Sequence, residues 1–376
     1  MKTHTNAKAN PTKSHDTAGK QWLLVCRNDC ETILLEEITA IFKKSRLPFD
    51  VASSTHTQNG MVLLSNLDAA SEALLDQTEL VFERQRLPVV HSLPVDSIKT
   101  CAQTIIQDYF PKIDQTDLFW TLHAFTPDVE ECKPLGSRVR LIESAILEKL
   151  KKRFGRMFRR YQSTQTLQGK ENYLIVQVCM DRADHIYLSI HPKSLLIHAY
   201  PGGEQRMPFD SKSPSRSYLK LFEAVSRMPE RPMPGQTAID LGAAPGGWTY
   251  YLLKQGCKVT AVDNGSLKIP NTASLPGSLS IVKTDGMLFS PAEKEYDWLC
   301  CDMLRPPRQT LDLLAKWIEH GWMKSFVVNV KLPQKNPVAM LQEARDYLAE
   351  QNLAFLKIKQ LYHDRDEVTI MGMVNR

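Results

Sequence analysis

The sequence predicts an α/β protein in which a doubly wound C-terminal domain follows smaller α+β units. Beyond residue 205, short apolar segments alternate with helix-like segments, an order typical of parallel strands joined by crossover helices. The chain has 376 residues, of which 43% are hydrophobic, so it can form two or three separate cores. Proline-rich segments at 87–96 and 200–217 provide boundaries between these units.

We expect four parts along the chain. Residues 1–19 are polar and show no periodicity, so we expect a disordered tail, with a nucleic-acid-binding arm as the alternative. Residues 20–95 form a first α+β unit, in which a helix over CETILLEEITAIFKKS lies between the strands QWLLVCRND and NGMVLLS. Residues 96–200 form a second unit with one long helix and the strands FWTLHAF, YLIVQVCM and HIYLSIHP. Residues 205–376 form the doubly wound domain.

Six apolar segments predict the strands of the C-terminal domain: TAIDLG, KVTAVDN, LSIVKTD, DWLCCDM, SFVVNVKL and EVTIMGM. The first of them is followed by a Gly- and Pro-rich kink, GAAPGG, and then by a helix-like segment that ends at Gly256. In a doubly wound sheet, ligands bind at the carboxyl edge of the strands, where this kink lies. The sequence therefore predicts a cofactor site at the kink.

Composition excludes several classes of protein. No run of about 18 apolar residues could span a bilayer, and the N-terminal segment lacks the apolar core of a secretory signal, so we expect a cytoplasmic protein with no membrane partner. The eight cysteines show no CxxC spacing, which favours reduced thiols over disulfides or a metal site. The net charge of +5 permits a polyanionic partner without requiring one.

The residues around the kink favour one kind of cofactor. The fingerprint of dinucleotide sites has a glycine in its middle, and that glycine is missing between Gly242 and Gly246. Acidic residues lie at the ends of the first four strands, at Asp240, Asp263, Asp285 and Asp302. A ring of carboxylates suits a cationic cofactor without phosphates, such as S-adenosylmethionine. Asp263 would accept hydrogen bonds from its ribose hydroxyls and Asp285 from its adenine amino group. The alternative is that the kink and the carboxylates only end strands.

The motifs DLGAAPGGWTYYL, VDNG, DG, CDM, NVKLP and LYHDRDEVT together resemble those of the RlmM family. Members of this family are bacterial 23S ribosomal RNA 2′-O-ribose methyltransferases specific for a cytidine, within the broader FtsJ-type class. The resemblance is close over about the last 170 residues, and the earlier units resemble the family's N-terminal region with its THUMP RNA-binding domain. Ala244 stands where the family usually has cysteine. The backbone would make the contact at this position, so we still expect Ala244 to contact the cofactor.

The resemblance implies a catalytic tetrad of two lysines and two carboxylates: Lys220, Asp302, Lys331 and Glu367. We expect Lys331 to be the general base for the ribose hydroxyl, with the other three orienting it and the hydroxyl. A lysine at its reference pKa of about 10.4 is protonated at neutral pH, so burial and the neighbouring cation Lys220 would have to lower the pKa of Lys331. The resemblance also implies cofactor contacts at Ser217, Ala244, Pro245, Gly246, Gly247, Asp263, Asp285 and Asp302.

A helix-like segment in the second unit predicts the RNA-binding surface. Its apolar residues recur at three- and four-residue spacing, as on a helix packed on a sheet: Ile142, Ile146, Leu150, Phe154 and Met157. The basic residues lie off this stripe: Lys149, Lys151, Lys152, Arg153, Arg156, Arg159 and Arg160. Such a cluster can bind phosphates, although it can also be only a solvated helix face.

Several functions remain to be compared. A base N-methyltransferase would usually carry a (D/N)PP(Y/F) motif after the fourth strand, where this chain has CDML. A small-molecule methyltransferase would not need the N-terminal half. A non-catalytic RNA-binding ribosome assembly factor, or a methyltransferase of another RNA, stays open. From the resemblance we expect 23S ribosomal RNA before subunit assembly as the partner, and a monomer.

Overall fold

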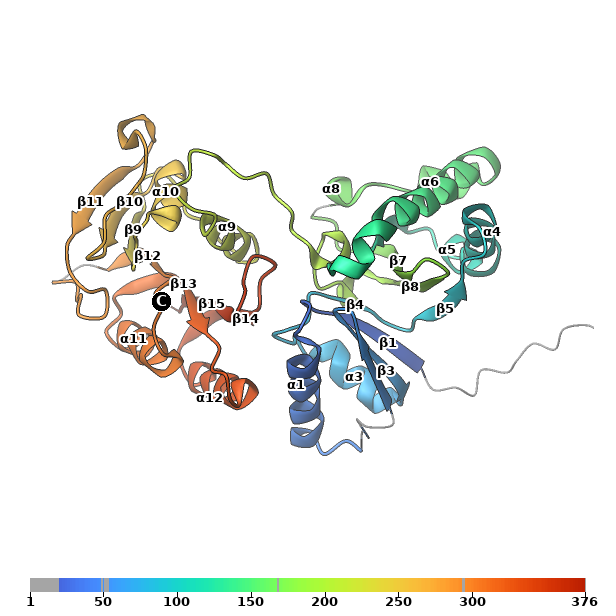
Figure 1. Cartoon of the computed structure of the whole chain (residues 1–376), viewed down its shortest axis with the longest axis horizontal. Helices are drawn as coiled ribbons and strands as arrows, with labels where there is room; N and C mark the ends of the chain where they lie inside the picture. Colours follow the sequence, from blue (N-terminus) through green and yellow to red (C-terminus); the bar gives the residue numbers. More distant parts are fainter. Residues whose placement is uncertain (1–19, 49, 51–53, 168, 293–294, 376) are drawn as a thin grey trace, which may run out of the picture.

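The computed structural model describes residues 20–48, 50, 54–167, 169–292 and 295–375, and the predicted tail at 1–19 lies outside them. Figure 1 shows the C-terminal domain on one side and two smaller sheets on the other, joined by the segment that precedes α9 (Tyr218–Ser226). The first sheet and the second sheet each have four strands, and the third has seven. The four-part division of the chain stays a prediction.

The first sheet is antiparallel, in the order β2-β3-β1-β4. Its strands and helices are β1 (Lys20–Val25), α1 (Glu31–Lys44), β2 (Thr55–Gln58), β3 (Met61–Leu67), α3 (Ala69–Gln77) and β4 (Gln85–Leu87). Asn59 and Gly60 both have positive φ and connect β2 to β3, which is the two-residue hairpin turn that Asn-Gly favours. The first two residues of the predicted strand NGMVLLS therefore form the turn, and β2 is a strand that the sequence did not predict.

The second sheet has the order β5-β8-β7-β6, with β6 parallel to β7. Its strands are β5 (His91–Pro94), β6 (Phe119–Phe125), β7 (Tyr173–Arg182) and β8 (His185–Pro192). Although β5 precedes residue 96, it pairs with β8 and so belongs to this sheet. The α-helices are α4 (Ile98–Thr104), α5 (Pro111–Asp114), α6 (Gly136–Arg153), α7 (Gly155–Arg159) and α8 (Thr164–Leu167). There is also a π-helix, η1 (Ile105–Tyr109), and three 3₁₀ helices, η2 (Glu130–Leu135), η3 (Lys193–Leu195) and η4 (Pro201–Gly203).

The prediction of one continuous basic helix is wrong at Phe154. This residue leaves the helical conformation, with φ −131° and ψ 53°, and separates α6 from α7. Its side chain is 42% exposed, whereas Ile142, Ile146 and Leu150 are fully buried against the sheet. After the break, Met157 resumes the buried stripe, so Phe154 is the one predicted core residue that points outward.

The C-terminal sheet has the order β11-β10-β9-β12-β13-β15-β14, which confirms the doubly wound fold. The strands are β9 (Thr237–Leu241), β10 (Lys258–Val262), β11 (Ser278–Val282), β12 (Tyr296–Cys301), β13 (Met323–Lys331), β14 (Leu353–Lys359) and β15 (Glu367–Val374). Two features differ from the predicted parallel sheet: β15 runs antiparallel to β13, and β14 is an additional edge strand. A loop over 360–366 joins these last two strands as a hairpin, without a crossover helix.

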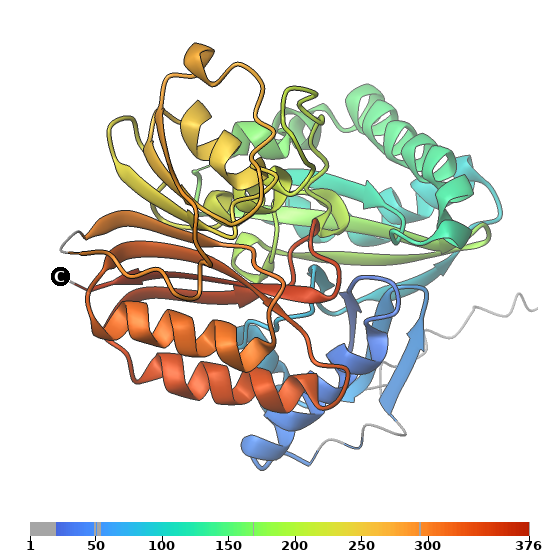
Figure 2. The ribbon, with the colours of Figure 1, turned by 60° about the vertical axis from the view of Figure 1, so that its left-hand side comes forward.

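Helices cover both faces of this sheet, as Figure 2 shows. One face packs on α11 (Pro307–Glu319) and α12 (Pro337–Ala349), whose Trp317 and Leu341 join the core with Phe326 of β13. The other face packs on α9 and α10 (Gly247–Lys254), through Leu221 and Leu252. A short turn, η5 (Thr272–Ser274), precedes β11. Within the described parts of the chain, no helix is long and apolar enough to cross a bilayer.

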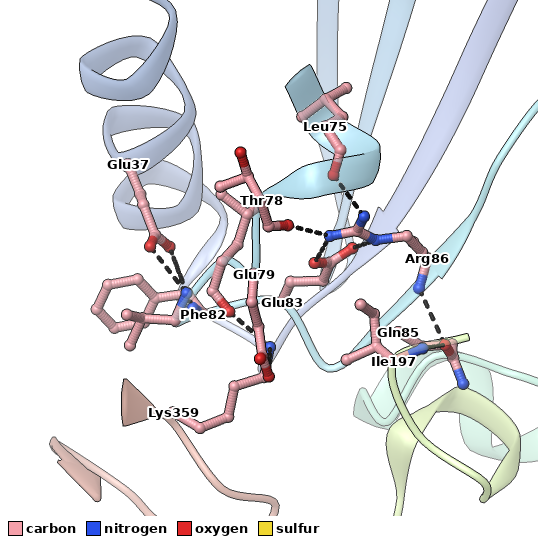
Figure 3. Close-up of polar contacts among 12 residues, drawn as sticks. Glu37, Leu75, Thr78, Glu79, Phe82, Glu83, Gln85, Arg86, Ile197 and Lys359 are labelled. Carbon is pink, nitrogen blue, oxygen red and sulfur yellow. Dashed lines mark hydrogen bonds and ion pairs between the residues drawn. The ribbon is translucent and has the colours of Figure 1, made fainter. Parts of the chain in front are cut away.

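Polar contacts fix the first unit to the edge of the large sheet (Figure 3). The carboxylate of Glu37 accepts hydrogen bonds from the backbone of Val81 at 2.8 and 2.9 Å and from Arg345 of α12 at 3.0 Å. The fully buried Lys359 of β14 donates to the carbonyl of Leu80, and burial lowers the pKa of its ammonium to about 8. The N-terminal unit and the C-terminal domain are thus held by specific buried polar groups.

Candidate active site

Two glycines shape the kink between β9 and α10. Gly242 has φ +78°, and a Cβ there would lie 2.3 Å from Cγ of Met303. Gly246, at the N-terminus of α10, has φ +113°, and a Cβ there would lie 2.6 Å from Ile269. Residues with a Cβ rarely adopt such φ values, so only glycine lets the backbone turn this tightly.

A cavity opens at the carboxyl edge of the sheet beside this kink. Its lining residues come from the ends of β9 to β12: Gly242, Ala244, Asp263, Asn264, Thr284, Asp285, Gly286, Asp302, Met303, Leu304 and Arg305. Of the predicted cofactor residues, Ala244 and the carboxylates Asp263, Asp285 and Asp302 line it. Sequence reasoning missed Arg305, which follows the predicted CDM motif closely.

The two carboxylates predicted to bind the adenosine part are already anchored. Asp263 accepts hydrogen bonds from the backbone of Ala244 at 2.9 Å and of Gly265 at 2.5 Å. Asp285 accepts from the backbone of Met287 at 2.9 Å and from Arg305 at 2.6 Å, and both contacts hold the pKa of Asp285 below its usual value. Each carboxylate oxygen can accept a second hydrogen bond, so both residues still fit a ligand with hydroxyl and amino donors.

The acidic residue of the first of these strands, Asp240, does not line this cavity. Asp240 is buried and accepts a hydrogen bond from Thr249 of α10 at 2.6 Å, and burial raises its pKa to about 7. The prediction that Asp240 joins a ring of ligand-facing carboxylates is therefore wrong. Its position within the apolar strand TAIDL puts the side chain beneath α10 instead of at the edge.

The remaining predicted cofactor residues lie close by but do not line the cavity. Pro245 and Gly246 are absent from the lining of the cavity, and the carbonyl of Pro245 accepts a hydrogen bond from the backbone of Lys268. Gly247 packs against Ser217, whose Oγ would lie 2.3 Å from a Cβ there. Ser217 itself lines a second cavity. Their roles in cofactor binding stay predictions.

The four residues of the predicted tetrad meet at the boundary of the two cavities. The carboxylate of Glu367 bridges both lysines, with Oε1 at 2.6 Å from Nζ of Lys220 and Oε2 at 2.7 Å from Nζ of Lys331. Lys220 also lies 3.4 Å from Asp302. The strand register explains the meeting, because Lys331 of β13 lies directly opposite Glu367 of β15.

The charges of the tetrad are tightly balanced. Burial alone would raise the pKa of Glu367, which is 3% exposed, but hydrogen bonds from the two lysines lower it to about 2. Burial alone would lower the pKa of Lys220, but the negative charges of Asp302 and Glu367 have the larger effect, and the pKa of Lys220 is raised. Burial raises the pKa of Asp302. Lys220 is therefore held as a cation beside Lys331.

A buried polar chain that sequence reasoning missed supports the tetrad. Asn329 donates to Asp302 at 3.0 Å and accepts from Thr369 at 2.7 Å, and Thr369 also lies 2.8 Å from Asp364. Burial raises the pKa of Asp364 well above its usual value. Asn329 interrupts the apolar run FVVNV, and a buried amide needs partners, so the sequence did contain a signal for it.

The second cavity has a volume of about 830 Å³, and three members of the tetrad line it. Its lining residues come from the first unit, the second unit and the C-terminal domain. The C-terminal domain contributes Lys220, Lys331 and Glu367, the second unit contributes Asp128, and the first unit contributes Arg27 and Arg84. Since Asp302 lines the first cavity, beside the kink, and pairs with Lys220, the tetrad connects the two cavities.

The predicted RNA-binding residues have different surroundings. Lys151, Lys152 and Arg153 are exposed at the end of α6, and Arg156 and Arg159 are exposed on α7. Lys149 is half-buried and bonds to Gln103 at 2.7 Å. The half-buried Arg160 donates to the carbonyl of Thr116 and pairs with Asp114 at 2.9 Å, so it braces a turn of the fold.

Comparisons with known proteins identify the family. Residues 214–331 match the FtsJ-like methyltransferase family. Over 364 residues, the chain is 34% identical to ribosomal RNA large subunit methyltransferase M of Xanthomonas oryzae pv. oryzae, covering 93% of this chain and 98% of the relative. The chain belongs to the ribosomal RNA large subunit methyltransferase M family. The methyltransferase M of Xanthomonas campestris pv. campestris is 33% identical over 368 residues, again covering 93% of this chain and 98% of the relative.

Membership of the methyltransferase M family makes the chain an S-adenosylmethionine-dependent methyltransferase, and so confirms the predicted enzyme class and cofactor. Lys220, Asp302 and Lys331 lie within the matched FtsJ-like segment, whereas Glu367 lies beyond it. A crystal structure of TrmN from Thermus thermophilus is similar at 14% identity with a TM-score of 0.35, covering 94% of this chain and all of that one.

Replacing Asp263 with alanine should weaken binding of S-adenosylmethionine about ten- to a hundredfold in calorimetry, because a charge-assisted hydrogen bond to the ribose is lost. Asp263→Asn keeps one acceptor oxygen and should lose less. The exposed Asp312 of α11 provides a matched control, Asp312→Ala, with unchanged affinity. Equal affinity of wild type and Asp263→Ala would remove Asp263 from the cofactor site.

Proposed function

We propose that this enzyme transfers a methyl group from S-adenosylmethionine to the ribose 2′-hydroxyl of a cytidine in large-subunit (23S) ribosomal RNA. The observation that supports this most directly is the place of the tetrad. Asp302 faces the cofactor cavity, while Lys220, Lys331 and Glu367 face the adjoining cavity, which has room for a nucleotide. The relatives from both Xanthomonas species are named as methyltransferases of large-subunit ribosomal RNA.

The reaction needs a base, because a ribose hydroxyl is a weak acid. When bound, S-adenosylmethionine supplies an electrophilic methyl group. Lys331 would act in its neutral form and accept the hydroxyl proton at Nζ. Glu367 lies 2.7 Å from this nitrogen and would stabilise the ammonium that forms.

Lys220 and Asp302 would position the reacting groups. Lys220 is fixed by two carboxylates and keeps its charge, so it would hold Glu367 and the ribose oxygen in place. Asp302 is fixed in turn by Asn329 and lies on the cofactor side. The alignment of oxygen and methyl carbon is the main contribution of such a site, since correct positioning removes much of the barrier.

Methyl transfer to RNA transcripts tests this function. With radiolabelled S-adenosylmethionine, unmodified 23S ribosomal RNA should accept about one methyl group per chain, and small-subunit RNA should accept none. From the family resemblance, we expect protein-free RNA to be a better substrate than the assembled subunit, and the enzyme to act as a monomer. Binding of the RNA without any transfer would instead indicate a non-catalytic assembly factor.

Replacing Lys151, Lys152 and Arg153 with glutamine should weaken RNA binding at all sequences. Each lost phosphate contact should lower the slope of log affinity against log salt by about 0.7–0.9, because fewer counterions are released. A matched control changes three exposed basic residues at the end of α1, Lys43, Lys44 and Arg46, to glutamine. An unchanged slope in the first variant would show that the end of α6 is only a solvated surface.

A further inference from the structure

We propose that Arg84 binds a phosphate of the RNA backbone next to the target ribose. The identity of the RNA rests on the proposed function, but the anion site rests on the structure alone. Arg84 belongs to the first unit, directly before β4, and lines the same cavity as Lys220, Lys331 and Glu367. The N-terminal unit would therefore bind substrate inside the active site itself.

The backbone of Arg84 is rigidly placed. Its N–H donates to the carbonyl of Val25 in β1 at 2.7 Å. On the other side lies Gly203, with φ +74°, where a Cβ would be only 2.3 Å from the carbonyl oxygen of Arg84. A side chain at position 203 would displace this segment. The fold thus holds one arginine at a fixed point of the cavity.

The guanidinium of Arg84 has few partners for a side chain that is 5% exposed. Within the described residues, its Nε has no hydrogen-bond partner. Nη2 lies 3.4 Å from the carbonyl of Tyr362, and Nη1 lies 3.7 Å from Asp128, so both contacts are long. The group also lies 5.0 Å from the centre of the Tyr362 ring. A buried charge in this state is costly unless a ligand completes its hydrogen bonds.

Arg86, two residues further along the chain in the same unit, is an arginine whose guanidinium donors have hydrogen-bond partners (Figure 3). It forms a two-pronged pair with Glu83 at 2.7 and 2.5 Å and donates to the carbonyls of Leu75 and Thr78 at 2.6 and 2.9 Å. Arg86 does not line the cavity, whereas Arg84 does. Of these two arginines, the one that faces the cavity, Arg84, is thus the one whose Nε has no hydrogen-bond partner among the described residues.

The surroundings favour a phosphate as the missing partner. Three further arginines line this cavity, Arg27, Arg216 and Arg365, and each comes from a different segment. With Arg84 and the two lysines of the tetrad they make six basic side chains in the lining, against four carboxylates. Arg27 donates to the carbonyl of Asp364 at 3.2 Å, which leaves most of its donors available. A guanidinium fork matches the oxygens of a phosphate, and several arginines together suit a polyanion. RNA is the polyanion that the reaction brings to this cavity.

Arg84→Gln should weaken RNA binding about ten- to a hundredfold, as expected for one lost charge-assisted contact, and should lower the salt slope by about 0.7–0.9. Arg84→Lys should restore part of the affinity but not all, because lysine lacks the fork. Arg46→Gln removes the same charge from an exposed position of the same unit and should change neither quantity. The melting temperature of Arg84→Gln and its affinity for S-adenosylmethionine should match those of wild type. If Arg84→Gln does not fold, Arg27→Gln is the second variant.

A methylphosphonate scan identifies the contacted phosphate. Replacing single phosphates of an RNA fragment by neutral methylphosphonates should reveal one position near the target where wild type loses affinity and Arg84→Gln loses none further. In other words, the effect of the neutral phosphate and the effect of Arg84→Gln should be coupled at that position. If the two effects are additive at every position, or if Arg84→Gln leaves the salt slope unchanged, the proposal is overturned. If wild type transfers no methyl group while the coupling is found, the anion site stands and the proposed function fails.

Discussion

Replacing Lys331 with alanine should lower the rate of methyl transfer about 10²–10⁴-fold, the usual contribution of a positioned general base. The change removes the nitrogen that lies 2.7 Å from Glu367, but it removes no part of the cofactor cavity. Single-turnover assays with saturating RNA would measure the chemical step, and calorimetry with S-adenosylmethionine should give a nearly unchanged affinity. The barrier rises by about 3–5 kcal/mol on this account.

Two variants make this result specific. Lys331→Arg should not recover activity, because a guanidinium with a pKa above about 12 stays protonated and cannot accept a proton. The exposed Lys335, four residues further on, provides the matched control Lys335→Ala, which should transfer methyl groups at the wild-type rate. Near-normal transfer by Lys331→Ala would exclude Lys331 from the mechanism.

Replacing Glu83 with alanine should destabilise the fold by about 3–5 kcal/mol, because it leaves the buried charge of Arg86 without its partner. The two side chains are essentially inaccessible to solvent and form a two-pronged pair. Chemical denaturation followed by circular dichroism would measure the loss. The pair also lies beside the segment that contacts β14, so the docking of the first unit should weaken as well.

A double variant separates pairing from simple loss of packing. Changing Glu83 and Arg86 together to apolar residues of similar size should recover much of the stability, because no unpaired charge remains. The exposed pair of Lys133 and Glu130 provides the contrast, and Glu130→Ala should leave the stability nearly unchanged. A small effect of Glu83→Ala alone would mean that water reaches Arg86.

Much of the catalytic domain could be predicted from the sequence because it depends on local patterns. Apolar segments predicted β9 to β13, and parallel strands place their carboxyl ends at one edge, so Asp302 and Lys331 could be brought together in advance. The edge strand β14 was missed because its alternation is broken by lysines, one of which, Lys359, is buried in the contact with the first unit.

The second cavity could not be predicted in this way. Arg84 and Tyr362 are 278 residues apart, and they meet because the first unit packs against the loop between β14 and β15. A sequence pattern also does not distinguish Arg84 from Arg86, since only packing decides which guanidinium finds partners. Asp240 shows the same limit, because its position in a strand does not reveal whether it faces the cavity or α10.

The chemical position of the transferred methyl group tests the central claim most directly. A methylated 2′-hydroxyl cannot attack the neighbouring phosphodiester, so alkaline hydrolysis leaves the bond on its 3′ side intact. After transfer to unmodified 23S ribosomal RNA, the account predicts radiolabel in one alkali-resistant dinucleotide whose first nucleoside is cytidine, and no label with Lys331→Ala. Label recovered in a mononucleotide would place the methyl group on a base and contradict the account.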